Sequence, residues 1–425
     1  MIRSSGLIRT AGSRPLLGAL ALVIGLVGCA TSASPPESAA APEGAAATEA
    51  ASSPYATLAS VKAFERVQAT LEEMKQVVLE DAETEREASE GVRAILRTLA
   101  MSIDTAGDQN PKAPHFARMD TKIRKVGGDN PDAEYDSVHL DARWDYVIRG
   151  NVGSVRHLSF TISGAVQPDG RRPKLAYFNE RTLGADAKGD FEIHLTKQDD
   201  GGPNWVDTSK GVSSILVRQY IGDRDREALA SYDIAVVGRT PYEGIPDSTD
   251  REIARALMAA SYGLQFMFTM HRTIGPELWD APNTFASFNS DSFGEDISSA
   301  DNLYMFGTYQ IEEDEALVIE TDPLDVRYWN LAIESRWHET VDYLTRRTHL
   351  SLDHAVVDDD GKLRFVVAHG RTPHPNWVET AGHREGWMTF RWVGERDAQV
   401  TMPTVLRVKR AEVADVIAAR QAGGS

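Results

Sequence analysis

The chain has a single cysteine, Cys29, among its 425 residues. One cysteine cannot form a disulfide within the chain, so buried apolar surface must hold the fold together. Basic residues are also scarce, because 45 Lys and Arg stand against 63 Asp and Glu, a formal net charge of −18. Nucleic-acid binding needs a clustered basic surface, so we predict no nucleic-acid partner. Phosphate-binding glycine loops, dinucleotide fingerprints and nucleophile elbows are missing from the sequence, and we predict no cofactor.

The apolar run near the N-terminus, residues 16–27, is shorter than the roughly 20 residues that span a bilayer, but it suits the core of a signal peptide. Three arginines precede this run, and Leu26-Val27-Gly28-Cys29 closes it. The tetrapeptide resembles the lipobox of bacterial lipoproteins. The resemblance implies that residues 1–28 are removed and that Cys29 carries fatty acyl chains, such as palmitate, as a membrane anchor. Ala30, where an aspartate would favour the inner membrane, implies the periplasmic face of the outer membrane. The alternative is a plain secretory leader with an incidental cysteine.

Composition divides the rest of the chain. Residues 30–54 are rich in Ala, Ser, Pro and Glu and predict a disordered tether, whereas residues 61–78 carry apolar side chains at helical spacing. Between the two β-rich regions, Thr249 and Glu252 form a capping-box signature for a further helix, which we expect to be clamped between them. The expected segments are a tether 29–54, a helical segment 55–104, a β repeat 125–240, a helical connector 241–298, a second β repeat 299–412 and a C-terminal tail 413–425.

The two β-rich regions are copies of each other. Val147-Ile148 matches Val318-Ile319 at an offset of 171 residues. Six residues beginning Pro203-Asn204-Trp205 match the block beginning Pro375-Asn376-Trp377, at an offset of 172. Arg218-Gln219-Tyr220 matches Arg391-Trp392-Val393, at an offset of 173. Similarity that holds register over about 75 residues indicates an internal duplication.

Each repeat contains short β-branched or aromatic segments separated by turn signals such as Pro168-Asp169-Gly170. Several short strands without intervening helices are typical of an antiparallel sandwich or jelly roll. The sequence therefore predicts a mainly β protein with two tandem antiparallel β-sandwich or jelly-roll-like repeats, N-terminal helices, and a helical segment between the repeats.

Three short motifs resemble a bacterial family, the domain of unknown function 1214. They are Asp129-Asn130-Pro131, the Asn-Trp-Val-acid-Thr block and the Arg218-Gln219-Tyr220 strand. The resemblance covers most of residues 125–410 and implies a jelly-roll β-sandwich. It implies no activity and no catalytic residue. The lipobox and the long N-terminal helices depart from the family's usual pattern.

The repeated Asn-Trp-Val-acid-Thr blocks supply the first candidate ligand-binding residues. An indole beside amide and carboxylate groups suits a sugar, whose ring face stacks on the aromatic while its hydroxyls pair with the polar groups. The alternative is a structural turn, in which Asn bonds the local backbone and Trp fills the core. The candidate side chains are Asn204, Trp205, Asn376 and Trp377.

Arg218 and Arg391 are the other ligand-binding candidates. In the second copy Met388, Phe390 and Trp392 alternate onto one strand face, which places Arg391 on the opposite face. Such an arginine could grip a carboxylate or phosphate of a ligand. The alternative is a structural ion pair with Asp207 or Glu379.

Asp207 and Glu379 are also weak candidates for catalysis, because glycoside hydrolysis uses two carboxyl groups roughly 5 to 10 Å apart. Equivalent positions in a duplicated fold tend to be separated by a domain's width, which weakens this hypothesis. Histidines gather in the second repeat, and His369, His374 and His383 are the weak candidates for a metal site. No HxH or HExxH spacing supports one, so we predict no metal.

Three functional hypotheses follow. The first is a lipid-anchored envelope module that binds a glycan or another polar small molecule. The second is a hydrolase or lyase acting on envelope or imported carbohydrate. The third is a structural protein whose partners are other envelope proteins. The sequence leaves open whether the protein is an enzyme.

Overall fold

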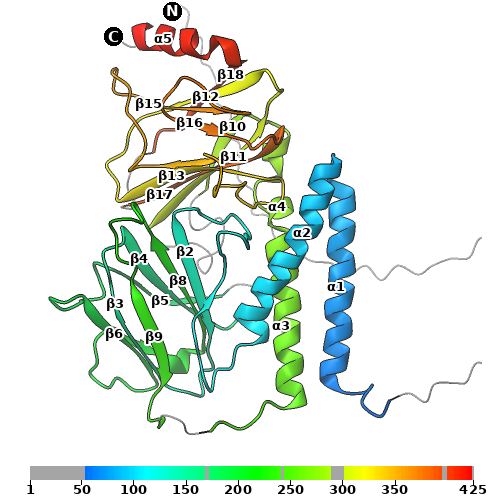
Figure 1. The fold of residues 1–425 in the computed structure, drawn as a ribbon. Coiled ribbons are helices and arrows are strands. Elements are labelled where there is room, and N and C mark those ends of the chain that lie inside the picture. The colour runs from blue at the N-terminus through cyan, green and yellow to red at the C-terminus, as the bar shows by residue number, and fades with distance from the viewer. Residues whose placement is uncertain (1–52, 168–171, 241–243, 289–300, 395–399, 424–425) are drawn as a thin grey trace, which may run out of the picture. The chain divides into compact units, whose positions relative to one another are not determined.

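The computed structural model of the chain describes residues 53–167, 172–240, 244–288, 301–394 and 400–423. Cys29 and nearly all of the expected tether lie outside these ranges. The residues from Ser53 onward form one unit (Figure 1). Its helices are α1 Ala59–Asp81, α2 Glu85–Ser102, α3 Asp250–Phe268, α4 Met270–Thr273 and α5 Val413–Gly423, with a π-helical turn at Ile103–Gly107. Within the described part of the chain, no helix is long and apolar enough to cross a membrane.

Two β-sandwiches follow one another along the chain. The strands of the first are β1 Ala117–Arg118, β2 Ala133–His139, β3 Tyr146–Asn151, β4 His157–Gly164, β5 Lys174–Asn179, β6 Asp190–Thr196, β7 Trp205–Asp207, β8 Val212–Tyr220 and β9 Ser231–Val236. Those of the second are β10 Thr284–Phe288, β11 Asn302–Gln310, β12 Glu315–Thr321, β13 Tyr328–Glu334, β14 His349–Ser351, β15 Leu363–Ala368, β16 Trp377–Glu379, β17 Glu385–Val393 and β18 Thr404–Lys409.

The strand order confirms the predicted duplication. The first sandwich pairs a sheet of order β1-β2-β8-β4-β5 with one of order β7-β6-β3-β9. The second pairs β10-β11-β17-β13-β14 with β16-β15-β12-β18, so every strand has its counterpart in the same place. The expected mainly β fold with two tandem sandwiches is therefore confirmed. Among the described strands, β6–β7 and β15–β16 are the parallel pairs, because the loop after the longer strand carries the chain back beside it.

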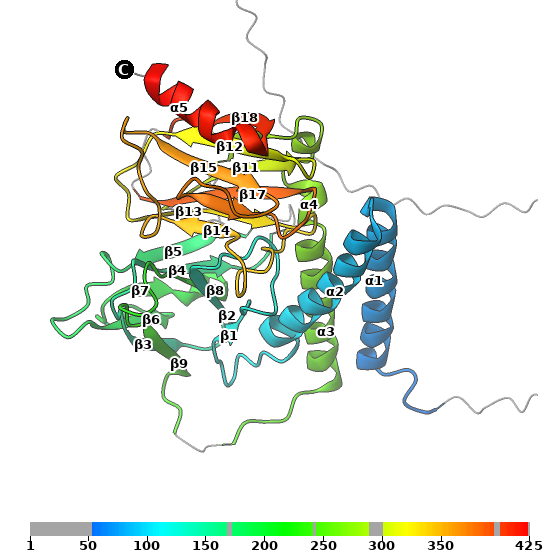
Figure 2. The same ribbon diagram turned by 45° about the horizontal axis from the view of Figure 1, so that its top comes forward.

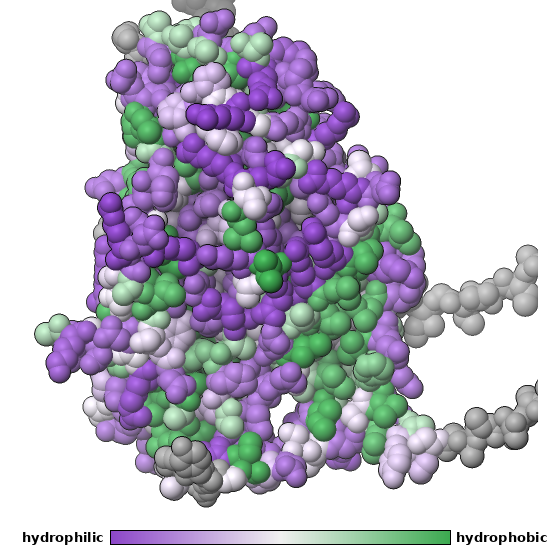
Figure 3. Space-filling model, viewed as in Figure 1, coloured by the Kyte–Doolittle hydropathy of each residue, from purple (hydrophilic) through white to green (hydrophobic). Residues whose placement is uncertain are grey.

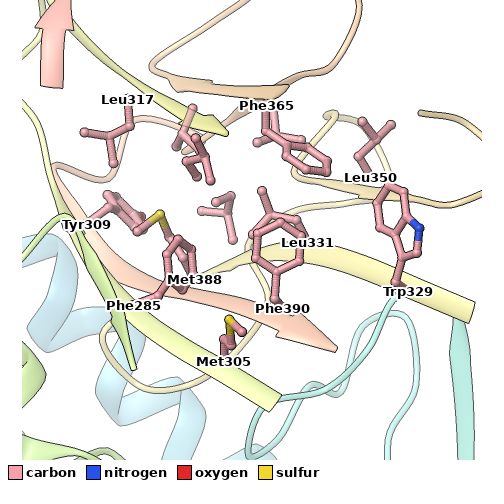
Figure 4. Close-up of a cluster of buried hydrophobic side chains, with 14 of the residues drawn as sticks. Phe285, Met305, Tyr309, Leu317, Trp329, Leu331, Leu350, Phe365, Met388 and Phe390 are labelled. Carbon is pink, nitrogen blue, oxygen red and sulfur yellow. The ribbon is translucent and has the colours of Figure 1, made fainter. Parts of the chain in front are cut away.

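Each sandwich has its own apolar core between its two sheets. Phe365 and Phe390 meet across the second core with ring centroids 5.2 Å apart (Figure 4). Trp392 stacks on Phe390 at 4.9 Å. The first core is centred on Phe160, whose ring meets Phe191 edge to face at 5.5 Å. Alternating residues supply both cores, as the strand patterns predict.

The helices form a bundle beside the sandwiches, with α1 parallel to α3 (Figures 1 and 2). Asp250, at the start of α3, accepts hydrogen bonds from the backbone N–H groups of Ala59 and Ser60, both at 2.9 Å. At the other end His271 contacts Asp81 at 2.7 Å. The expectation that α3 is clamped between the β repeats was wrong, because one face of α3 packs against α1 and α2 instead.

Two segment boundaries also differ from the expected ones. Strand β10 falls inside the range expected to be a helical connector, and it pairs with β11 as an edge strand of the second sandwich. The expected C-terminal tail contains α5, which buries Val413 and Ile417 against β12 and β15. Both segments are short, and their structure depends on packing or pairing with other elements.

Polar side chains join the two sandwiches where their five-stranded sheets meet. Tyr220 of β8 and Tyr328 of β13 pack with ring centroids 5.1 Å apart. The Asn130 carboxamide accepts a hydrogen bond from the Asn330 amide at 2.7 Å and also bonds the Tyr328 hydroxyl at 3.2 Å. Asn130 belongs to the motif that resembles the uncharacterised family, so this motif joins the two repeats.

Candidate functional site

A cavity of about 510 Å³ lies where both five-stranded sheets meet α2, α3 and the loop at residues 126–129. A volume of this size is typical of small-molecule sites. Its wall is mostly apolar near α3 and becomes polar toward the strands. The polar wall residues include Asp120, Asp129, Tyr135, Ser137, His139, Arg172, Arg218, Tyr304, His338 and Arg391.

The duplication brings two equivalent arginines to this cavity. Arg218 lies on β8 opposite Tyr135 of β2, and Arg391 lies on β17 opposite Tyr304 of β11. Strand alternation points both arginines away from the sandwich cores, toward the junction of the two sheets. Each arginine is only 2% exposed. One Arg–Tyr pair from each repeat therefore lines a single cavity.

Arg391 has an incomplete set of hydrogen bonds. Its Nη2 donates to the Gly128 carbonyl at 2.6 Å and to Glu334 Oε1 at 3.2 Å. Its Nη1 has no hydrogen-bond partner within the described residues. A buried guanidinium donor without a partner costs free energy, so this group is suited to an anionic or carbonyl oxygen of a ligand. Arg218 donates to Thr161 Oγ1 at 3.2 Å.

Glu334 and His338 lie behind Arg391. The Glu334 carboxylate contacts His338 Nδ1 at 2.6 Å and is fully buried. Burial opposes its ionisation, but the hydrogen bond from His338 and the positive charges of His338 and Arg391 outweigh burial and lower the pKa of Glu334. The Arg391 side of the cavity therefore contains an ionised Arg–Glu pair.

Two aspartates in the cavity wall have raised pKa values, in contrast to Glu334. Burial, with repulsion from Asp129, raises the pKa of Asp120 to about 8. Burial also raises the pKa of Asp129 to about 6, against the attraction of Lys125 and the hydrogen bonds from Thr340. Among the described residues, nothing bonds to Asp120 Oδ1. Asp120 is therefore mostly uncharged at neutral pH and can donate a hydrogen bond into the cavity.

We expect Asp120→Asn to stabilise the protein increasingly as the pH rises. The folded-state pKa of Asp120 lies above its ordinary value of 3.8, so the stability linked to its protonation is lost between about pH 4 and pH 8. Each pKa unit is worth about 1.4 kcal/mol, and we expect the stabilisation to grow by about 1 to 3 kcal/mol from pH 5 to pH 7. Urea unfolding at both pH values measures it. The control Asp207→Asn alters a half-buried carboxylate whose pKa is lowered by the hydrogen bond from Ser209, and the stabilisation should not grow in the same way.

Two glycines let the floor of the cavity approach α3. Gly127 and Gly128 have positive φ angles of 47° and 73°. A Cβ on Gly127 would lie 2.3 Å from the Met267 side chain, and a Cβ on Gly128 would lie 3.6 Å from Arg391. The backbone therefore passes directly beneath α3 and presents the Gly128 carbonyl to Arg391.

The Asn-Trp blocks lie outside this cavity. Asn204 has a φ of 54°, and its amide donates to the carbonyls of Leu183 and Glu192. Asn376 is fully buried and donates to the carbonyls of Val356 and Arg364. These contacts are those of a structural turn. Trp205 donates to Thr196 at 2.9 Å, and Trp377 packs on the α5 side of the second sandwich with Arg347 over its ring.

The structure does not bring the other candidates together. Asp207 caps the short turn that follows β7, and Glu379 pairs with Arg346 at 2.9 Å in the other sandwich. Neither pairs with Arg391, whose carboxylate partner is Glu334. The candidate histidines each have separate contacts: His369 with Thr380, His374 with Asp358 and His383 with Glu90. In the described ranges, no group of three or more His, Cys, Asp or Glu could hold a metal ion.

Several cavity residues were not singled out by the sequence. Tyr135 and Tyr304 are equivalent in the two repeats, but insertions shift their offset from that of the recognised blocks. Asp120 and His338 lie in loops, where no periodicity marks them. In each repeat, the tyrosine pairs with the equivalent arginine on the neighbouring strand. Aligning the two repeats at these paired positions would identify both tyrosines.

Comparison with known proteins supports the fold. No family model and no curated protein matches the chain. The solved structure of an uncharacterised protein from Burkholderia cenocepacia is similar, with a TM-score of 0.75 and 25% identity over 82% of this chain and 97% of that one. A protein from Vibrio parahaemolyticus has a TM-score of 0.47 and 14% identity over 74% and 96% of the two chains. The first likeness shows that a bacterial protein has this architecture, and it assigns no activity.

Proposed function

We propose that the protein is a ligand-binding module of the bacterial cell envelope, anchored by lipid on Cys29 at the periplasmic face of the outer membrane. The observation that carries the binding function is the pair of repeat-equivalent arginines in one cavity, with Arg391 Nη1 unpartnered among the described residues. Buried polar groups without partners are uncommon in native proteins, and a ligand oxygen would satisfy this one. The lipobox resemblance supports the anchor.

The geometry supports binding better than the alternative of carbohydrate hydrolysis. Asp207 and Glu379 lie in different sandwiches, each engaged with neighbours of its own. A pair of cooperating carboxyl groups must flank one bond. The third hypothesis, a scaffold for other envelope proteins, does not account for a cavity in which Arg391 Nη1 has no hydrogen-bond partner among the described residues.

Thermal unfolding of residues 53–425 tests the binding function, because all of the described cores lie in this unit. A ligand at 100 times its Kd stabilises the folded state by about 2.7 kcal/mol. We expect organic anions to raise the Tm by several degrees, and simple sugars or divalent metals to raise it less. A panel that leaves the Tm unchanged would contradict the proposal.

A matched pair of variants locates the binding. Arg218→Gln removes a cavity cation, whereas Arg149→Gln removes an arginine on the outer sheet that pairs with Glu192. We expect the ligand-induced shift to be lost only in the first variant. If Arg218→Gln fails to fold, Arg172→Gln replaces it, because Arg172 lines the same cavity and is half-buried. A shift that survives both cavity variants would place binding elsewhere.

A further inference from the structure

Helix α3 has an apolar face in addition to the one that packs on the helical bundle. The residues of this second face recur at spacings of three and four, so they form one stripe along the helix, and they line the cavity. The stripe consists of Ala259, Tyr262, Gly263, Phe266 and Met267, and it continues to Met270 of α4. Leu264 and Phe268, which pack with α1 and α2, lie on the other face. The second apolar face of α3 is therefore a wall of the cavity.

This apolar wall is accessible from outside. Tyr262 and Phe266 are 56% and 39% exposed, and their rings stack with centroids 6.2 Å apart. Figure 3 shows apolar residues gathered over α2 and α3 beside the first sandwich. Contiguous apolar surface of this kind commonly marks a site of ligand or protein binding. The stacked rings therefore indicate that an apolar group binds against them.

The apolar lining extends beyond α3 and can adjust its shape. Four of the chain's ten methionines, Met101, Met119, Met267 and Met270, line the cavity. A methionine side chain is unbranched and fits apolar partners of varied shape. Val126 and Phe306 add apolar surface from the loop and from β11. An apolar group in the cavity would therefore meet apolar side chains from several elements.

The charged groups at the strand end of the cavity have partners within the protein. Arg391 pairs with Glu334 at 3.2 Å, and Arg218 also has contacts of its own. Asp129 accepts a hydrogen bond from the Thr340 backbone N–H at 2.8 Å. Groups of both signs therefore lie at this end. The α3 wall, which is apolar along its whole length, distinguishes ligand classes more sharply.

The enclosure of the cavity suits a small hydrophobic molecule. Its lining residues come from α2, α3 and both five-stranded sheets, so the space of about 510 Å³ is bounded on several sides. Enclosed, mostly apolar spaces of this size are typical of small-molecule sites. A sugar would leave its hydroxyls without partners along the α3 wall. A hydrophobic molecule would instead remove both its own surface and the stacked rings from water.

We propose that the ligand of this cavity is a small hydrophobic molecule whose apolar body lies along α3 and provides most of its affinity. This inference rests on the proposed binding function and names the class of ligand. The apolar body covers the exposed rings of Tyr262 and Phe266, and the methionines adjust to its shape. A polar group on the ligand fits at the strand end, where it adds to the affinity without determining the class.

Calorimetric titration of residues 53–425 with 1-butanol, 1-hexanol, 1-octanol and octanoate tests the inference. The three alcohols share one uncharged head, so differences among their affinities report the apolar wall alone. Burial of each methylene is worth about fourfold in affinity, so we expect 1-octanol to bind at least about 50-fold more tightly than 1-butanol. Octanoate carries a chain of the same number of carbons on a charged head, and it separates recognition of the chain from recognition of the head.

A matched pair of helical variants tests the position of the apolar body. Phe266→Asp places a charge on the α3 wall, and Phe64→Asp changes an exposed aromatic of α1 that does not line the cavity. We expect the first variant to weaken 1-octanol binding at least about 10-fold and the second to leave it unchanged. Both side chains are partly exposed, so both variants should fold, which circular dichroism checks. If Phe266→Asp fails to fold, Tyr262→Asp replaces it.

The outcomes separate this inference from the proposed function. Equal affinity of the three alcohols, or equal weakening by the two variants, would show that the α3 wall does not hold the ligand and would overturn the inference. Binding of octanoate without any binding of 1-octanol would overturn it too, because the head would then provide the affinity, while the binding module would stand. The absence of binding by every probe and every compound of the thermal panel would overturn both proposals.

Discussion

Replacing Trp337 with alanine should lower the free energy of unfolding by about 3 to 5 kcal/mol, the range for a large aromatic removed from a core. Trp337 lies between the second sandwich and the helical bundle and is 3% exposed. Its ring stacks on Phe268 of α3 at 5.6 Å, and its Nε1 donates to the Glu87 carbonyl of α2 at 2.8 Å. Gly91 of α2 packs so closely that a Cβ there would lie 2.7 Å from the indole.

Urea unfolding followed by far-ultraviolet circular dichroism and by tryptophan fluorescence measures the effect. We expect the two probes to separate in Trp337→Ala, because the helices lose a buried aromatic contact with the second sandwich. The control is Trp205→Ala, which removes a 36% exposed indole and its hydrogen bond to Thr196. That change should cost about 1 kcal/mol. Equal losses in the two variants would show that Trp337 does not join the helices to the sandwich.

Replacing Arg391 with methionine should destabilise the protein by about 3 to 5 kcal/mol, because it leaves a buried carboxylate without its cation. Glu334 is fully buried, and without Arg391 it keeps the hydrogen bond with His338 Nδ1. The substitution also removes the donor to the Gly128 carbonyl, which holds the floor of the cavity.

A double-variant cycle separates charge from packing. Arg391→Met with Glu334→Gln removes both charges, and we expect it to recover at least half of the loss. Arg149→Met breaks an exposed pair with Glu192 and should cost less than about 1 kcal/mol. If the double variant is as unstable as the sum of the single ones, the loss comes from packing and the ion pair contributes nothing.

Much of the fold follows from local sequence pattern. Strand alternation and the repeated blocks predicted two sandwiches, because both signals depend on neighbouring residues. The partner of α1 could not be predicted in this way, since its apolar face would suit α2 equally well. Phe64 illustrates the difficulty: it falls on the predicted buried stripe, yet it is 54% exposed, because Ala63 and Val67 face the bundle instead.

The site was predictable only in part. Strand alternation correctly predicted that Arg391 faces away from the core. It could not show that Arg218 lines the same cavity, because a duplication does not determine how the two copies face each other. The Asn-Trp blocks were conspicuous for a different reason. Asn204 has a positive φ angle, and the side-chain amide of each asparagine donates to two backbone carbonyls. These structural requirements favour asparagine in both repeats, whatever the protein binds.

The capping of α1 by Asp250 also determines the order in which the chain can fold. The groups that fix α1, Asp250 and Ser261, lie about 190 residues further along the chain. During synthesis, the first sandwich can complete its sheets before α3 is available to cover the apolar face of α1. A folding catalyst or holding chaperone would therefore be needed longest by the N-terminal helix, which is the first part of the unit to emerge and one of the last to be covered.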